Sequence, residues 1–434
     1  MRKASSLSNL VKSHRSRAAG PGGVESPGPG PRFGKALDPR NNSMNMIRLG
    51  LAALVLFAHS FYLAGAGEGP HVRGENLGGW AVAGFFALSG FLITGSRFTN
   101  GLGEYLVHRV ARIYPAFLAC LAVTIAVFAP LGFLHQNGTL AGYWTTETTP
   151  LRFVFSNLFL EMRNYDVAFT PANVPFAGSW NGSLWSLYYE FLCYLIIAAV
   201  GGVAWVRRSP LPLVLAFIAS VLLYANLPVT MPLLQDTNFS LLAKLLPFFL
   251  GGAVVQALSK WVGLHWSTGV GSIIGAAVCI AAVPTWGGQL ASPLIAYGLL
   301  WVSSVLPSPR LIRVHDVSYG FYIYAWPVQQ LLALYGVHNR GMLVYILTSA
   351  AGTLVLAIAS WLLVERPVMR AVRRRKAARV SMAAPGKQPA VLAALETEAA
   401  DGGQSDSAEG LEGQQVPAEA SAGTGQVFRA PGLQ

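Results

Sequence analysis

The amino-acid sequence predicts an all-α, polytopic membrane protein with about ten transmembrane helices and disordered cytoplasmic tails. Of its 434 residues, 53% are hydrophobic and 12% are charged, whereas a soluble domain carries about 25% charged residues. Long apolar stretches alternate with short polar loops, and helices are favoured because backbone in lipid must satisfy its own hydrogen bonds. The net charge of +12 is spread between the apolar stretches, so we expect no nucleic acid as a partner.

Composition divides the chain into three parts. Residues 1–43 are rich in Gly, Pro, Ser and basic residues, which predicts a disordered basic N-terminal tail. Residues 381–434 hold seven acids against two basic residues and predict a second, acidic disordered tail. The body, residues 44–380, is the predicted transmembrane domain. All three cysteines of the chain lie in its apolar stretches, which favours buried thiols over a disulfide or a metal site.

Within the body, ten apolar stretches are long enough, or nearly so, to cross the roughly 30 Å hydrocarbon core of a bilayer. In order, these stretches are 47–65, 79–96, 114–133, 184–206, 211–229, 240–258, 268–284, 289–306, 317–336 and 343–364. A further stretch, 151–160, is too short to span, so we expect it to lie at the interface or to re-enter the membrane.

The distribution of basic residues predicts the orientation. With the N-terminus inside, the inner side carries Arg97, Arg109, Arg112, Arg207, Arg208, Lys260, Arg310, Arg313 and the basic cluster in 366–379. The outer loops carry only Arg73, Arg152, Arg163 and Arg340. Because inner loops are enriched in Lys and Arg, both termini are expected in the cytoplasm. The 366–379 cluster is also expected to contact anionic membrane lipids.

Two ionisable side chains fall inside predicted spans. Glu190 is the only one of the body's ten acids to do so, and His59 is the only histidine. Such residues are costly in lipid and are functional by default, although a satisfied structural role is the alternative. Helical rise places both at a similar depth in the outer half of the membrane. A carboxylate beside a histidine raises its basicity, so we predict that both are catalytic, with His59 as general base.

Three arginines are expected at the cytoplasmic ends of the same helices. Arg48 precedes His59 by eleven residues, about three turns of helix, so both face the same way with about 16 Å between them. Arg109 and Arg112 are three residues apart and share a helical face. Guanidinium groups bind phosphates bidentately, which favours a phosphate-bearing ligand. The alternative is that all three only anchor the topology.

Six motifs, in this order, resemble the bacterial acyltransferase-3 family of integral membrane acyltransferases. They are Arg48 with His59, the sequence FFALSGFLI, Arg109 with Arg112 followed by IYP, WSLYYE, SYGFYIYAWPVQQ and LVERPVMR. The resemblance covers about residues 45 to 370. One position departs from the family, since many members carry a histidine where Trp326 precedes Pro327 here. The soluble esterase-like domain that is fused to some members has no counterpart in this sequence.

The resemblance implies an O-acyltransferase in the bacterial inner membrane. Its expected co-substrate is a cytoplasmic acyl-CoA, commonly acetyl-CoA, with no bound cofactor, and its expected acceptor is a hydroxyl of a carbohydrate or glycolipid at the outer face. Arg48, Arg109 and Arg112 would hold the CoA phosphates. His59, oriented by Glu190, would act directly as base or through an acyl-histidine. Candidates for oxyanion stabilisation or packing, by position only, are Ser89, Ser186 and Tyr189.

Two other classes of protein compete with this interpretation. A proton-coupled transporter of a small acid or lipid-linked sugar would also use an intramembrane His and Glu, but no inverted repeat is visible in the sequence. A purely structural membrane scaffold would leave His59 and Glu190 without a reason. The sequence does not identify the acceptor, the acyl group or the oligomeric state.

Overall fold

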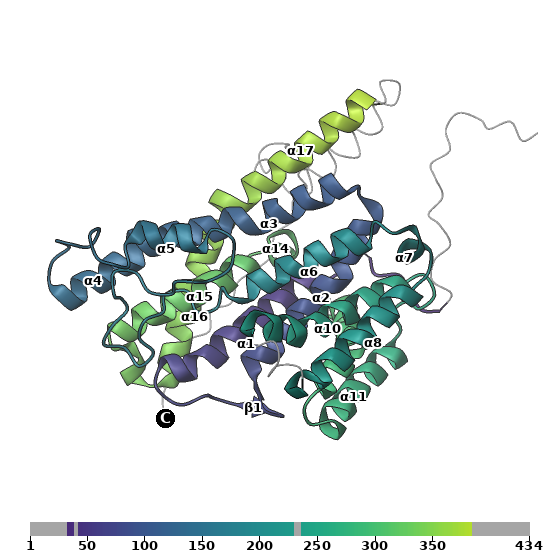
Figure 1. Cartoon of the computed structure of the whole chain (residues 1–434), viewed down its shortest axis with the longest axis horizontal. Coiled ribbons are helices and arrows are strands. Elements are labelled where there is room, and N and C mark those ends of the chain that lie inside the picture. The colour runs from purple at the N-terminus through teal and green to yellow at the C-terminus, as the bar shows by residue number, and fades with distance from the viewer. Residues whose placement is uncertain (1–32, 39–41, 230–235, 384–434) are drawn as a thin grey trace, which may run out of the picture. The chain divides into compact units, whose positions relative to one another are not determined.

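The structure is a computed structural model that describes residues 33–38, 42–229 and 236–383, and it is mostly helical (Figure 1). Its N-terminal part contains α1 (Met44–Leu63), the antiparallel hairpin of β1 (His71–Val72) and β2 (Glu75–Asn76), α2 (Leu77–Thr99), α3 (Leu102–Val123), the π-helical turn η1 (Thr124–Phe128), α4 (Ala129–Asn137), α5 (Pro150–Asn157) and α6 (Ser186–Val200). Its C-terminal part contains α7 (Ala204–Arg208), α8 (Leu211–Ala225), α10 (Thr237–Leu258), α11 (Trp266–Ala282), α12 (Gly287–Leu290), α13 (Ser292–Val305), α14 (Arg310–Val314), α15 (Ser318–Leu334), the 3₁₀ turn η2 (Val337–Arg340), α16 (Met342–Ser360), the π-helical turn η3 (Trp361–Glu365) and α17 (Arg366–Ala383). The chain forms two compact units, Met1–Arg375 and Lys376–Gln434, and every site residue lies in the first.

The all-α prediction is confirmed, and each of the ten apolar stretches falls on a helix. Among the described residues, five helical segments are long and apolar enough to cross a membrane: Met44–Leu63, Leu77–Thr99, Leu102–Asn137, Thr237–Leu258 and Met342–Ala378. Four shorter apolar helices have 10–17 residues: Ser186–Val200, Leu211–Ala225, Trp266–Ala282 and Ser292–Val305. The full number of ten spans therefore stays a prediction.

The outer surface of these helices is strongly apolar. On the last apolar segment, Val355 is 67% exposed and Leu363 is 77% exposed. Large apolar side chains that project from a helical bundle in this way indicate a surface that contacts lipid. The stretch 151–160 forms only the short helix α5, whose neighbour Phe159 is 79% exposed, as expected for an interfacial segment.

Helix α15 forms the centre of the fold, and its residues 318–330 are all buried. It carries tyrosines, a tryptophan and glutamines, which are tolerated because neighbouring backbone carbonyls accept their hydrogen bonds. Tyr319 donates to the carbonyl of Ile113, and Tyr322 donates to that of Ser183. The motif SYGFYIYAWPVQQ thus describes a polar helix that is enclosed by protein on all sides.

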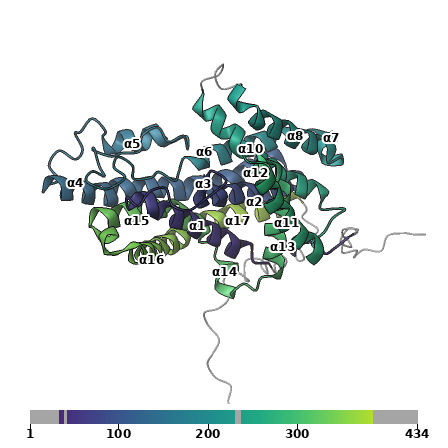
Figure 2. The same cartoon turned by 90° about the horizontal axis from the view of Figure 1, so that it is seen from below.

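Helices α1, α15 and α16 lie side by side (Figures 1 and 2). Arg48 near the start of α1 contacts Asp316 just before α15, and His59 further along contacts Trp326, so the two helices run parallel. This arrangement confirms that Arg48 and His59 face the same way. The hydroxyl of Tyr345 donates to the carbonyl of Gln329, while Gly320 packs on Ala357, so α16 runs antiparallel to α15.

Glycines allow α2 to pack directly on α10, as both cartoons show (Figures 1 and 2). A Cβ atom on Gly90 would lie 1.8 Å from the carbonyl oxygen of Phe249, and one on Gly252 would lie 1.9 Å from that of Ala87. Gly90 and Gly252 therefore permit close packing of the two helices. Hydrophobic driving force between helices is absent in lipid, and small residues at a crossing stabilise the pair by letting the two backbones come into close contact.

The predicted tails lie almost wholly outside the described residues. Of the N-terminal tail, residues 33–38 and 42–43 are described, and residues 33–35 pair with the segment after α10. Backbone hydrogen bonds join Lys35 to Leu264 in both directions, at 3.0 and 2.7 Å. Gly34 makes this approach possible with a φ of 80° and no Cβ against Gly263.

Candidate active site

Four charged side chains form an arginine cluster, which we define as Arg48, Arg112, Asp316 and Glu365. Arg48 donates to Oδ2 of Asp316 at 2.7 Å, and Arg112 donates to the same oxygen. Arg112 also reaches Oε2 of Glu365, at 3.2 Å, with the Glu365 side chain only 2% exposed. Two guanidinium groups therefore neutralise two carboxylates, as buried charges require.

A π-helical turn brings Glu365 to Arg112. Pro367 lacks an N–H and cannot complete the regular helical hydrogen bond, and the preceding turn η3 widens instead. The hydroxyl of Ser360 donates to Oε1 of Glu365 at 3.3 Å. The Glu-Arg-Pro sequence thus supplies a buried carboxylate that ties the end of α16 to α3.

Asp316 is the shared anion of the arginine cluster. Burial alone would raise the pKa of its carboxyl group, but the guanidinium groups of Arg112 and Arg48 and the hydrogen bonds from Ser318 outweigh burial and lower the pKa to about 2. Asp316 is therefore ionised at neutral pH, and it holds the two arginines in fixed positions between α1, α3 and α15.

Arg109 differs from the other two predicted phosphate ligands. Its guanidinium carbon lies 6.0 Å from the centre of the Tyr194 ring. Its buried Nε has no hydrogen-bond partner among the described residues. Arg48 and Arg112 bind carboxylates, whereas Arg109 has no ion pair among the described residues. The role of all three in binding CoA stays a prediction.

Glu190 is held by two hydroxyl groups. Ser89 on α2 and Tyr194 on α6 each donate to its Oε1 at 2.6 Å. The backbone carbonyl of Tyr194 in turn accepts from the hydroxyl of Tyr105 at 2.9 Å. Ser89 therefore uses its hydroxyl hydrogen to position Glu190, and Tyr194 connects Glu190 with Arg109.

The other two oxyanion candidates, Ser186 and Tyr189, also form hydrogen bonds within the protein. Tyr322 donates its hydroxyl hydrogen to the carbonyl of Ser183 at 2.8 Å. A hydroxyl has only one hydrogen to donate, so Ser186 is the donor in the hydrogen bond between the Ser186 and Tyr322 hydroxyl groups. Tyr189 donates to Oδ1 of Asn238 on α10 at 2.7 Å. These contacts tie α6 to α15 and α10, and an oxyanion role for either hydroxyl stays a prediction that requires rotation.

His59 lies against aromatic rings. Its ring centre is 4.9 Å from that of Trp326, edge-on, and 5.4 Å from that of Tyr62. The imidazole keeps some accessible surface, yet its Nδ1 is buried and unpartnered within the part of the chain that the structure describes. A histidine in this state can take up a proton or form a new hydrogen bond without breaking an existing one.

The expected contact between His59 and Glu190 is not formed. Neither a hydrogen bond nor an ion pair joins these two described side chains. Trp326 borders His59, whereas Tyr322, one turn earlier on α15, contacts the start of α6. These contacts place His59 and the start of α6 at least one helical turn apart along α15. Glu190 therefore cannot orient the imidazole by direct contact.

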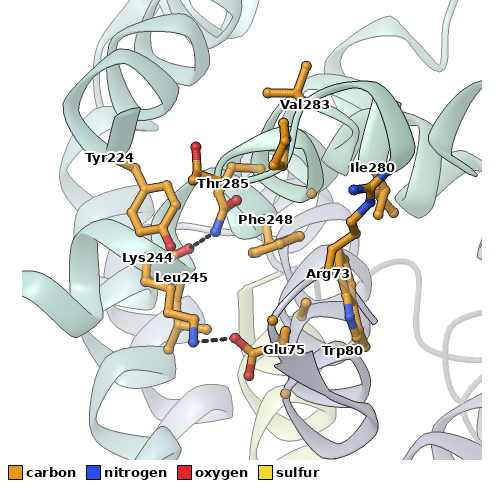
Figure 3. Close-up of a pocket in the computed structure, with 16 residues that line it drawn as sticks. Arg73, Glu75, Trp80, Tyr224, Lys244, Leu245, Phe248, Ile280, Val283 and Thr285 are labelled. Atoms are coloured by element: carbon orange, nitrogen blue, oxygen red, sulfur yellow. Dashed lines mark hydrogen bonds and ion pairs between the residues drawn. The ribbon is translucent and has the colours of Figure 1, made fainter. Parts of the chain in front are cut away.

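A separate cavity of about 260 Å³ opens between β1–β2, α2, α10 and α12 (Figure 3). Lys244 reaches across it to Glu75, and Trp80, Tyr224 and Arg73 also line it. Sequence reasoning missed Lys244, which lies in the apolar stretch 240–258, because only acids and histidines were considered there. His59 is not among the lining residues of this cavity.

Four further residues of the site also escaped sequence reasoning: Asp316, Glu365, Tyr194 and Trp326. Glu365 lies in a recognised motif, but its pairing with Arg112 joins residues far apart in the chain. For Asp316 the sequence offers one local indication, an aspartate two residues before a serine. Asp316 accepts hydrogen bonds from Ser318, an arrangement that is typical of the start of a helix. In the described ranges, no three His, Cys, Asp or Glu side chains are grouped to share a metal ion.

Comparison with known proteins identifies the class. A family model described as an acyltransferase domain matches residues 41–364. An O-acetyl transferase of Shigella phage Sf6 is 30% identical over 341 residues, covering 75% of this chain and 96% of the relative. Nodulation protein 10 of Rhizobium leguminosarum bv. viciae is 26% identical over 366 residues, covering 79% and 97%. No solved structure matches the chain.

The helical membrane fold and the family match together define a membrane acyltransferase. The chain belongs to the acyltransferase-3 family, and it is an enzyme that transfers acyl groups other than aminoacyl groups. The resemblance inferred from the six motifs is thereby confirmed.

Proposed function

We propose that the protein transfers an acyl group from cytoplasmic acyl-CoA to a hydroxyl of a carbohydrate or glycoconjugate at the outer face of the bacterial inner membrane. One observation carries the proposal. Arg48 and His59 lie on one face of α1 and both contact the parallel region of α15. This face presents cations at one end and a titratable base about 16 Å away, by helical rise.

The reaction needs only groups that this geometry supplies. The acceptor oxygen attacks the thioester carbonyl carbon while His59 takes the hydroxyl proton. The carbon–sulfur bond then breaks, the imidazolium returns the proton to the leaving CoA thiolate, and the products are an ester and free CoA. In the alternative, the His59 imidazole attacks the thioester carbonyl, the carbon–sulfur bond breaks, and CoA leaves as the thiol with the imidazole proton. The acceptor oxygen then attacks the acyl-imidazole, the carbon–nitrogen bond breaks, and the hydroxyl proton returns to the imidazole.

The donor end is assigned to the arginines. Arg109 has unused N–H groups, and a phosphate that binds there would lie near Arg112 on the same helical face. Arg48 and Arg112 are held in place by Asp316, so they line the donor end without a loss of side-chain freedom on binding. Acetyl is the proposed acyl group, because one relative is named an O-acetyl transferase.

Membrane vesicles of defined sidedness test this proposal. Acetyl-CoA that carries label in the acetyl group is supplied to the cytoplasmic face of inverted vesicles, and labelled ester is measured in the extracted glycan and glycolipid. Transfer that depends on the protein is expected only with acetyl-CoA at that face. Equal transfer from acetyl-CoA at the outer face would overturn the assigned direction. An absence of labelled ester from all carbohydrate fractions would overturn the acceptor class.

A further inference from the structure

A cluster of aromatic and amide side chains surrounds His59, and we define this acceptor cluster as His59, Tyr62, Phe176, Ser179, Trp326, Gln329 and Gln330. Trp326, Gln329 and Gln330 lie three and four residues apart on α15 and so share one face of that helix. That face meets α1 and the segment before α6. Trp326 is the immediate aromatic neighbour of His59, with 4.9 Å between the ring centres.

Three aromatic rings form one wall of the acceptor cluster. Trp326 lies 5.7 Å from Tyr62 and 5.4 Å from Phe176, measured between ring centres, and Tyr62 lies 5.8 Å from Phe176. Trp326 is fixed by its Nε1, which donates to the carbonyl of Ser179 at 3.0 Å. His59, Tyr62 and Phe176 keep accessible surface while Trp326 does not, so the rings line an approach to the imidazole.

Two glutamines provide the polar part. Nε2 of Gln329 donates to the carbonyl of Leu56 and to the hydroxyl of Ser60, and Nε2 of Gln330 donates to the carbonyls of Phe176 and Ser179. Carbonyl oxygens accept only, so these contacts fix which end of each amide is nitrogen.

The oxygen atoms of the two glutamine amides make no such hydrogen bonds with the described residues. Both glutamine side chains are fully buried, yet Oε1 of each lacks a partner in the described part of the chain, as do Ser179 Oγ and His59 Nδ1. Buried acceptors without donors are costly. The cluster therefore favours a ligand that brings several O–H donors. None of its members is a lysine, arginine or carboxylate, so its polar groups match a neutral ligand.

We propose that the acceptor cluster binds the sugar ring that receives the acyl group, and that this ring is neutral. The inference rests on the proposed function and assigns its acceptor subsite. The apolar face of the ring packs against the accessible Tyr62 and Phe176 rings, which the buried Trp326 holds in place, and ring hydroxyls donate to the Gln329 and Gln330 amide oxygens. The hydroxyl that is acylated faces His59. Trp326 and Gln330 position the acceptor, and His59 acts on it.

The test uses surface glycan from a deletion strain of the native host, separated by anion exchange into neutral and acidic fractions. Initial rates of labelled acetyl transfer to each fraction are measured for the parent, Trp326→Ala, Trp326→Phe and Gln330→Leu. Trp80→Ala is the matched control, because Trp80 also donates Nε1 to a carbonyl, that of Val72 at 3.0 Å, but lines the separate cavity (Figure 3).

We expect transfer to the neutral fraction. Trp326→Ala and Gln330→Leu should each raise the KM for glycan about five- to tenfold and leave the KM for acetyl-CoA unchanged. Trp326→Phe keeps an aromatic ring, so its KM for glycan should stay within about threefold of the parent value. This variant replaces Trp326→Ala in the test if Trp326→Ala does not fold. Glycan KM values that do not change in Gln330→Leu and Trp326→Ala, a larger effect in Trp80→Ala, or transfer confined to the acidic fraction would overturn the subsite. If the parent itself transfers no acetyl group to glycan, the proposed function fails instead.

Discussion

Removal of Arg112 is expected to destabilise the protein far more than removal of an exposed arginine. Its guanidinium binds Asp316 and Glu365, whose side chains are 13% and 2% exposed. Arg112→Met leaves Glu365 without a cationic partner, and breaking a buried ion pair from one side costs about 3–5 kcal/mol. The matched surface pair is Arg163 with Glu161, in which the arginine is 68% exposed. Its removal should cost about 0–1 kcal/mol.

A double-mutant cycle measures the interaction. The free energy of unfolding in mixed micelles is determined for Arg112→Met, Glu365→Gln and the double variant, with Arg163→Met as control. Glu365→Gln removes the uncompensated carboxylate, so the double variant should be more stable than the sum of single effects predicts, by about 1–3 kcal/mol. The reasoning is refuted if Arg112→Met lies within about 0.5 kcal/mol of the parent, or if the two changes are additive.

Four further predictions follow from the same contacts. The pKa of Asp316 in the folded protein is lowered to about 2. Ionised Asp316 therefore stabilises the fold fully above its unfolded pKa of about 4, and this contribution is lost as the pH falls toward 2. The difference in free energy of unfolding between the parent and Asp316→Asn should be constant from pH 8 to pH 5 and shrink only below that range. Glu190→Gln should lower the rate of transfer but leave residual activity, because the amide oxygen can still accept from Ser89 and Tyr194 while the carboxylate is lost; a parent-like rate would make Glu190 structural. Gly90→Ala should reduce the yield of folded protein, because the new Cβ meets the Phe249 carbonyl oxygen, and parent-like yield and thermal stability would argue against close α2–α10 packing. Arg109→Ala should raise the KM for acetyl-CoA about ten- to a hundredfold, and Arg109→Lys should restore it only in part. A parent-like KM in Arg109→Lys would indicate that Arg109 only sets the membrane topology.

The helices and the relation between Arg48 and His59 could be predicted because both follow from local rules. Apolar length predicts a buried or lipid-facing helix, and 3.6 residues per turn place two residues on one face. Both residues indeed contact the α15 region.

The partners of these residues could not be predicted in the same way. Asp316 is 268 positions from Arg48 in sequence, and Glu365 is 253 positions from Arg112, so each pairing depends on how distant helices pack. The expected contact of His59 with Glu190 is not formed for a related reason, because each depth was counted from an expected helix end and the packing of distant helices sets the actual levels. The neighbour of His59 is instead Trp326, at a position where the family pattern suggested a histidine and this sequence does not have one.

The central claim is that the imidazole of His59 performs the transfer. The direct measurement is the initial rate of labelled acetyl transfer from acetyl-CoA to native glycan in vesicles that contain equal amounts of folded parent, His59→Ala, His59→Gln or His135→Ala. Loss of a general base or nucleophile predicts a fall of about 100-fold or more for both His59 variants. The exposed His135 serves as control and should behave as the parent. Turnover of His59→Ala within about tenfold of the parent, in a variant shown to be folded, would contradict the account.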